Sequence, residues 1–193
     1  LKREDAQEVF SFKLRGAYNK MAHLSKAELK RGVIAASAGN HAQGVAFSCH
    51  KLKVKGTIFM PVPTPKQKIE QVKMFGKEFV DVVLTGDTFD DASQKAREFE
   101  KVHGSTFVHP FNDPKVIEGQ ATIGLELVQD SDFNIDYIFM PVGGGGLAAG
   151  VSAVVKALSP KTVMIGVEPE GAPAMYESIR QKKIVKLKSI DKF

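Results

Sequence analysis

Lys13 is the residue of this sequence best suited to covalent chemistry, because it stands between an aromatic residue and a small-residue turn in the run Ser11-Phe12-Lys13-Leu14-Arg15-Gly16-Ala17. A lysine amine attacks carbon only in its neutral form, and partial burial lowers its pKa in that direction. Such a lysine can form a Schiff base with a carbonyl compound. Most lysines are solvated surface charges, so this run alone does not establish a catalytic role.

A run of four glycines, Gly143 to Gly146, is the second candidate site. It follows an apolar stretch at 137–142 and precedes a helical pattern that extends to Leu158, an order that predicts strand, glycine loop and helix. Glycines leave backbone N–H groups accessible and a helix N-terminus carries positive dipole charge, so phosphate is the natural ligand. A plain tight turn is the simpler interpretation, but four glycines carry a large entropic cost for a turn alone.

The same glycines also fit a dinucleotide-binding pattern. Gly143 to Ala148 satisfies G-x-G-x-x-A, and Glu168 ends the next apolar run about where a ribose-binding acid belongs. Spacing therefore leaves an NAD-binding Rossmann protein open. That interpretation does not explain Lys13, because hydride transfer takes its chemistry from the nicotinamide.

Residues 33–51 repeat the strand, loop and helix order, with Ser37 to Asn40 as the loop. We expect Ser37 to cap the helix and the N–H groups of Ala38, Gly39 and Asn40 to converge on a carboxylate. Serine and asparagine are also ordinary capping residues, so a purely structural loop stays open. His41 is expected to be packed or hydrogen-bonded, because no second histidine or acid stands at metal-ligand spacing from it.

Taken together, these segments resemble the fold-type II pyridoxal phosphate enzymes, in the branch of threonine dehydratases (threonine deaminases) and serine racemases. The lysine run resembles that family's lysine motif, Ala36 to Gly44 its substrate loop, and the four glycines its phosphate loop. The resemblance implies pyridoxal phosphate (PLP) as the cofactor. It also implies an α/β fold of two three-layer domains, each built on a parallel sheet.

The resemblance further implies roles for individual residues. Lys13 would hold the cofactor as a Schiff base and act as the catalytic base at Cα, Phe12 would pack beside the cofactor ring, and Asn40 would hydrogen-bond its hydroxyl. The implied cofactor-binding residues are Phe12, Lys13, Asn40, Gly143, Gly144, Gly145, Gly146 and Leu147. The implied substrate-binding residues are Ser37, Ala38, Gly39, Asn40 and His41.

The implied activity is that of an ammonia-lyase, which converts L-threonine to 2-oxobutanoate and ammonia and L-serine to pyruvate as a side activity. In biosynthetic members this is the first step of isoleucine biosynthesis. Serine racemases usually carry a serine at the position of Ala38, whose hydroxyl exchanges a proton on the Cα face opposite the lysine, and alanine has no such proton. A racemase-like enzyme and a catalytically incompetent fragment or binding scaffold stay open. No metal is predicted, because the segment after Glu168 lacks the second acid that racemase-like relatives use.

Apolar runs that alternate with helical patterns predict parallel α/β sheets. The predicted strands are 33–36, 56–60, 79–84, 105–108, 137–142 and 163–167, and the predicted helices are 15–24, 41–51, 65–75, 88–103, 114–129, 146–158 and 173–182. By resemblance, 32–112 would form a small mobile domain, and 1–31 with 113–193 an incomplete large domain that binds the cofactor. Both ends are expected to be truncated, with Leu1 inside a strand.

Composition excludes some partners. The net charge of +5 comes from 27 basic and 22 acidic residues, and the lysines are spread rather than clustered with aromatics, so nucleic acid is not implied. No apolar run approaches the ~20 residues of a membrane helix. The single cysteine, Cys49, permits no internal disulfide and fits a reducing compartment. We therefore expect a cytoplasmic location, and the resemblance implies a small amino acid as the substrate and a homo-oligomer of the full-length protein.

Overall fold

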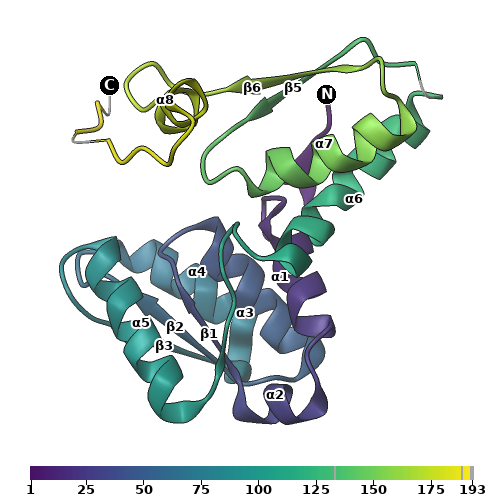
Figure 1. Ribbon diagram of the computed structural model, residues 1–193. Coiled ribbons are helices and arrows are strands. Elements are labelled where there is room, and N and C mark those ends of the chain that lie inside the picture. The colour runs from purple at the N-terminus through teal and green to yellow at the C-terminus, as the bar shows by residue number, and fades with distance from the viewer. Residues whose placement is uncertain (133, 188, 192–193) are drawn as a thin grey trace. The chain divides into compact units, whose positions relative to one another are not determined.

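The chain forms two units. The computed structural model describes residues 1–132, 134–187 and 189–191. Its contacts divide the chain into Leu1–Gly119 and Gln120–Phe193, so that the boundary falls within helix α6 (Pro114–Asp130; Figure 1). Each unit contains its own parallel sheet. The α/β class predicted from the sequence is confirmed.

The first unit is built on a four-stranded parallel sheet in the order β3-β2-β1-β4. The strands are β1 (Val33–Ala36), β2 (Gly56–Met60), β3 (Val80–Leu84) and β4 (Thr106–Phe107). All four residues of β1 are buried, as expected of a parallel strand covered on both faces.

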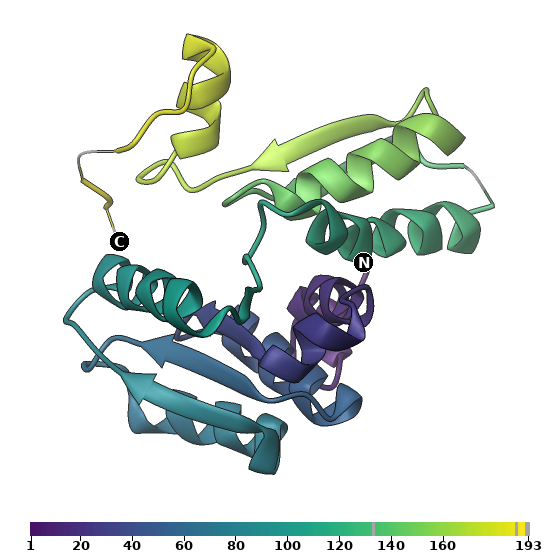
Figure 2. The same ribbon diagram turned by 60° about the horizontal axis from the view of Figure 1, so that its bottom comes forward.

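Helices cover both faces of this sheet. Val33 and Ala35 belong to the core cluster formed with α3 (Asn40–Leu52) and α4 (Lys66–Gly76), whereas Ile34 and Ala36 pack in a second cluster with α5 (Phe89–His103). Successive side chains of a strand point to opposite faces, which explains the alternation. Figure 2 shows α4 and α5 on opposite sides of the strands. The first unit is therefore a three-layer sandwich.

Two short features of the first unit differ from the prediction. Helix α2 (Lys26–Arg31) was not expected, because six residues are too few for a clear apolar period, although Ser25 and Glu28 form a capping box at its start. The predicted strand at Leu1 is wrong. Leu1 to Arg3 lie outside any strand and Glu4–Ala6 form a 3₁₀ turn, where Glu4 pairs with Arg15 of α1 (Lys13–Ala22) at 2.8 Å and so ties this segment to the helix.

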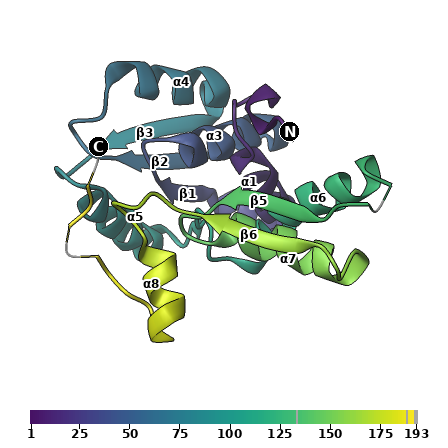
Figure 3. The ribbon, with the colours of Figure 1, turned by 90° about the horizontal axis from the view of Figure 1, so that it is seen from above.

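The second unit contains a two-stranded parallel sheet, formed by β5 (Tyr137–Pro141) and β6 (Val163–Val167), with α7 (Gly146–Leu158) and α8 (Ala174–Gln181). In β5, Ile138 and Met140 are buried while Tyr137 and Phe139 are exposed, so one face of the sheet is covered. Helix α7 runs alongside the two strands (Figure 3).

Apart from the strand expected at Leu1, the predicted strands and helices are present, and their ends lie within two residues of the predicted ones. Helix α1 begins two residues earlier than predicted, at Lys13. The division into residues 32–112 against 1–31 with 113–193 stays a prediction. Within the described part of the chain, no helix is both long and apolar enough to cross a membrane.

Candidate active site

Lys13 is the first residue of α1, and its side chain is largely shielded from water. Its Nζ donates a hydrogen bond to the carbonyl oxygen of Pro110 at 2.7 Å and lies 5.4 Å from the centre of the Phe12 ring. Burial lowers the pKa of the Lys13 amine below its usual value. The start of a helix also disfavours positive charge. Both effects increase the fraction of neutral, nucleophilic amine.

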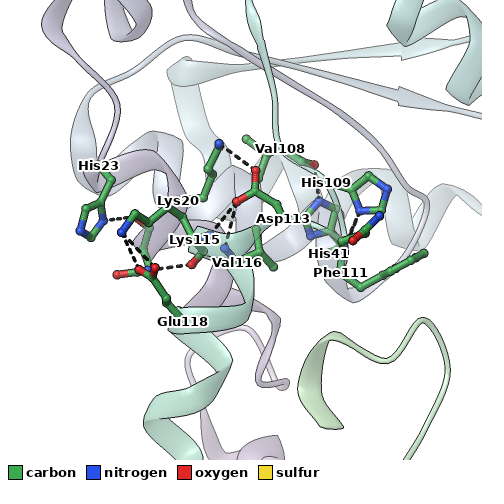
Figure 4. Close-up of polar contacts among 12 residues, drawn as sticks. Lys20, His23, His41, Val108, His109, Phe111, Asp113, Lys115, Val116 and Glu118 are labelled. Atoms are coloured by element: carbon green, nitrogen blue, oxygen red, sulfur yellow. Dashed lines mark hydrogen bonds and ion pairs between the residues drawn. The ribbon is translucent and has the colours of Figure 1, made fainter. Parts of the chain in front are cut away.

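The segment that supplies the Pro110 carbonyl, Val108 to Asp113, is fixed at its end by Asp113. Its Oδ1 accepts the N–H groups of Lys115 and Val116 at the start of α6, and its Oδ2 lies 2.8 Å from Nζ of Lys20 in α1 (Figure 4). Burial alone would raise the pKa of Asp113, but the hydrogen bonds from Lys20 and these N–H groups lower it overall. Asp113 therefore stays ionised and joins α1 to α6.

His109 fixes the middle of the same segment. Its Nδ1 accepts the N–H groups of Phe111 at 3.2 Å and Asn112 at 2.8 Å, so the ring proton is on Nε2 (Figure 4). Burial, followed by the charge of Arg97, lowers the pKa of His109 and favours this neutral form. Neither His109 nor Pro110 was predicted as a site residue. The run His109-Pro110-Phe111 is the sequence feature that could have pointed to this segment.

The predicted loop from Ser37 to Asn40 connects β1 to α3, with Asn40 as the first residue of the helix, but Ser37 does not cap the helix. The N-cap is Gly39, which has no side chain that could cap the helix. The Ser37 hydroxyl accepts the N–H of Gly39 at 3.2 Å. Ser37 lies too far before the first helical turn to reach its N–H groups. The first turn of α3 therefore has no side-chain cap and could hold an anion such as a carboxylate.

Within this loop, Ala38 packs against the first core cluster and Asn40 is exposed. The His41 side chain is buried, and its Nε2 donates to the carbonyl of Val108 at 2.8 Å. Burial lowers the pKa of His41 to about 4. The prediction that His41 is packed and hydrogen-bonded is confirmed, and its ring is turned into the protein.

Close packing brings the lysine turn beside this helix. A Cβ atom on Gly44 of α3 would lie 2.9 Å from the Lys13 carbonyl carbon, so only glycine permits the approach. The first unit thus brings together Phe12, Lys13 and the start of α3.

The glycine loop lies in the second unit, between β5 and α7. Gly145 is the N-cap of α7 with a φ of +83°, a conformation that favours glycine, and it too makes no side-chain hydrogen bond. A Cβ atom on Gly145 would lie 2.9 Å from Cε of Met175, whereas one on Gly143 would meet nothing within 4 Å. Leu147 follows in the first turn of α7. The free N–H groups of this turn could hold a phosphate.

Glu168 has a structural partner. Its two carboxylate oxygens accept the N–H groups of Met175 at 2.9 Å and Tyr176 at 2.7 Å, at the start of α8. This capping role explains why an acid stands at position 168 without a ribose or a metal as its partner. In the described residues, no group of three or more His, Cys, Asp or Glu side chains could hold a metal ion.

Taken separately, residues of each unit have chemistry that suits one part of pyridoxal phosphate. A shielded lysine with a lowered pKa suits its aldehyde, and an uncapped glycine loop at a helix N-terminus suits its phosphate. The residues present fit the cofactor.

Comparison with known proteins gives the same cofactor. The family model described as "Pyridoxal-phosphate dependent enzyme" matches residues 1–193. The chain is 56% identical to the L-threonine dehydratase biosynthetic IlvA of Halalkalibacterium halodurans and 53% identical to that of Bacillus subtilis, in each case over all of this chain and 46% of the relative. The chain thus spans about half the length of the curated relatives it matches.

Solved structures agree. The processed form of threonine deaminase isoform 2 from Solanum lycopersicum matches all of this chain, and 55% of its own, with 51% identity and a TM-score of 0.95. Maize serine racemase matches 98% of this chain, and 56% of its own, with a TM-score of 0.93 but only 32% identity.

Proposed function

Since this chain belongs to the pyridoxal-phosphate dependent enzymes, we propose that the protein acts as an L-threonine dehydratase, which converts L-threonine to 2-oxobutanoate and ammonia. L-serine, converted to pyruvate, would be a lesser substrate. The relatives at 56% and 53% identity that support this proposal are named biosynthetic threonine dehydratases, so we place the reaction at the start of isoleucine biosynthesis. The observation that carries the proposal is the shielded amine of Lys13, whose pKa is lowered.

Lys13 has two tasks in this proposal. Its neutral amine would hold the cofactor through the aldehyde carbon, with loss of water, and as a free amine it would accept the Cα proton of the substrate. The bound cofactor supplies an electron sink for the charge that develops at Cα. Both tasks need a neutral amine, which the burial of Lys13 favours.

Backbone groups at two helix starts hold the anions. We assign the cofactor phosphate to the N–H groups of Gly143 to Gly146 and Leu147, and the substrate carboxylate to those of Ser37 to His41. His41 would contribute through its backbone, because its ring is bonded to Val108. Asn40 would meet the ring hydroxyl of the cofactor, and Phe12 would pack beside the ring.

Ala38 favours elimination over racemisation. Racemisation needs a second proton-exchanging group on the Cα face opposite Lys13. Alanine has none, and the buried His41 ring is already occupied. The lower identity to serine racemase than to threonine deaminase supports the same choice.

A product assay tests the proposal. The purified protein is supplied with pyridoxal phosphate and L-threonine, and the keto acid and ammonia are measured beside the visible absorbance of the bound cofactor. We expect 2-oxobutanoate and ammonia in equal amounts, and little D-serine from L-serine. D-serine formed as fast as pyruvate would favour a racemase. Absence of visible absorbance would favour a binding scaffold.

The domain division and homo-oligomeric assembly are carried over from the family, and the cytoplasmic location rests on the single cysteine. We propose that residues 32–112 move as the small domain against 1–31 with 113–193. Limited proteolysis with and without L-threonine tests the division, and light scattering tests the assembly.

A further inference from the structure

Helix α3 approaches the lysine turn backbone to backbone, at Gly44. A Cβ atom on Gly44 would lie 2.9 Å from the carbonyl carbon of Lys13, and 3.0 Å from both its carbonyl oxygen and the nitrogen of Leu14. Real Cβ atoms essentially never come within 3.0 Å of a neighbour. Because those atoms belong to the backbone, a side chain here would have to move α1 itself.

A second glycine contacts the same turn from another helix. A Cβ atom on Gly119 of α6 would lie 2.6 Å from the carbonyl oxygen of Arg15 and from Cα of Gly16. Gly119 belongs to the first unit, like α1 and α3. The turn that begins with Lys13 is therefore held from two sides, and neither contact leaves room for a methyl group.

Backbone freedom does not explain these glycines. Both lie inside helices and neither has a positive φ. Glycine is the least favourable helix residue after proline, so its presence at both positions indicates a steric need. What the two contacts fix is the path of the backbone at Lys13. That path decides where the amine, now 2.7 Å from the Pro110 carbonyl, can reach.

We propose that Gly44 and Gly119 are positioning residues for Lys13: by admitting α3 and α6 to backbone contact, they place its amine where it meets the aldehyde carbon of the cofactor. This inference rests on the proposed function. Neither glycine needs to touch the reacting atoms, since both act through the backbone of α1. A displacement of about 1 Å at a reacting group can lower a rate roughly 100-fold.

The test compares Gly44→Ala with Gly124→Ala. Gly124 is a matched control, because its Cβ would lie 2.9 Å from the carbonyl oxygen of Val151 in the second unit, an equally close backbone contact away from Lys13. Attachment of saturating pyridoxal phosphate to Lys13 is trapped with borohydride and timed by peptide mass spectrometry. Binding of pyridoxine 5′-phosphate, which has no aldehyde, is measured in parallel.

We expect Gly44→Ala to slow trapping at Lys13 at least ~10-fold while the affinity for pyridoxine 5′-phosphate stays unchanged. Gly124→Ala should attach the cofactor to Lys13 at the rate of the unmutated protein, even if its melting temperature falls as much as that of Gly44→Ala. Equal trapping rates in the two variants would overturn the inference. If Gly44→Ala does not fold, Gly119→Ala is measured in the same way and decides. Failure of the unmutated protein to attach the cofactor at Lys13 would instead refute the proposed function.

Discussion

The loop before α3 and the loop before α7 follow the same strand, loop and helix order, yet glycine serves a different purpose in each. Gly145 has a φ of +83°, a backbone conformation that residues with a Cβ rarely adopt, so the fold itself favours glycine there. Gly39 has a φ of −134°, and a Cβ atom on it would meet nothing within 4 Å. A glycine that the fold does not require leaves room for a ligand. The loop before α3 also carries side chains whose substitution can alter the reaction, whereas the loop before α7 offers only backbone groups.

Lys13→Ala should have the largest effect, because neither loop can replace an amine. We expect loss of the visible absorbance of the attached cofactor and at least a ~100-fold lower elimination rate, the scale of general acid-base contributions. Affinity for pyridoxine 5′-phosphate should persist, because the glycine loop is untouched. A variant that kept both its colour and its turnover would contradict the assignment.

Acid should destabilise the first unit through the buried His41. The effect should be confined to that unit, because all five histidines lie before residue 120. The folded-state pKa of about 4 lies below the usual 6.5, so the unfolded chain binds more protons between these values. This contribution, on the order of 3 kcal/mol, is complete above pH 6.5 and lost as the pH falls toward 4. Denaturant unfolding at pH 7.5 and pH 4.5 measures it. The free energy of unfolding should depend less on pH in His41→Gln. An unchanged pH dependence in this variant would assign the effect to other groups.

Two substitutions in the glycine loop should separate fold from ligand. Gly145→Ala should lower the free energy of unfolding by about 1–2 kcal/mol, the cost of a left-handed conformation for a residue with Cβ. Gly143→Ala should leave thermal melting unchanged and weaken pyridoxal phosphate binding roughly 10-fold, because its methyl group enters open space where we place the phosphate. Thermal melts beside cofactor titrations measure both. Equal losses of stability in the two variants would make the loop a simple turn.

Ala38→Ser should have the smallest effect. The new hydroxyl would provide a proton-exchanging group on the Cα face opposite Lys13, and so raise the ratio of D-serine to pyruvate formed from L-serine. Chiral chromatography of the products measures the ratio, with Gly39→Ser as a control that adds the same group one residue away. No change in the ratio, or the same change in both variants, would refute the role of position 38.

The elements of the fold could be predicted because parallel α/β units alternate apolar strands with amphipathic helices, a local signal. The chemistry of Lys13 could be inferred from its neighbours, but its partner could not. Pro110 lies 97 residues away and contributes a backbone carbonyl, which carries no side-chain signature. Similarly, Glu168 stands at the spacing of a ribose-binding acid, and only the position of α8 reveals that it caps a helix.

The hydrogen bond from Lys13 to Pro110 has a consequence for the direction of attack. A carbonyl oxygen can only accept, so the amine must point an N–H at it. In the neutral amine the lone pair then occupies a different tetrahedral direction, away from the carbonyl. The bond therefore limits the orientations of the nucleophilic orbital before any electrophile arrives, which reduces the rotational search at the moment of reaction.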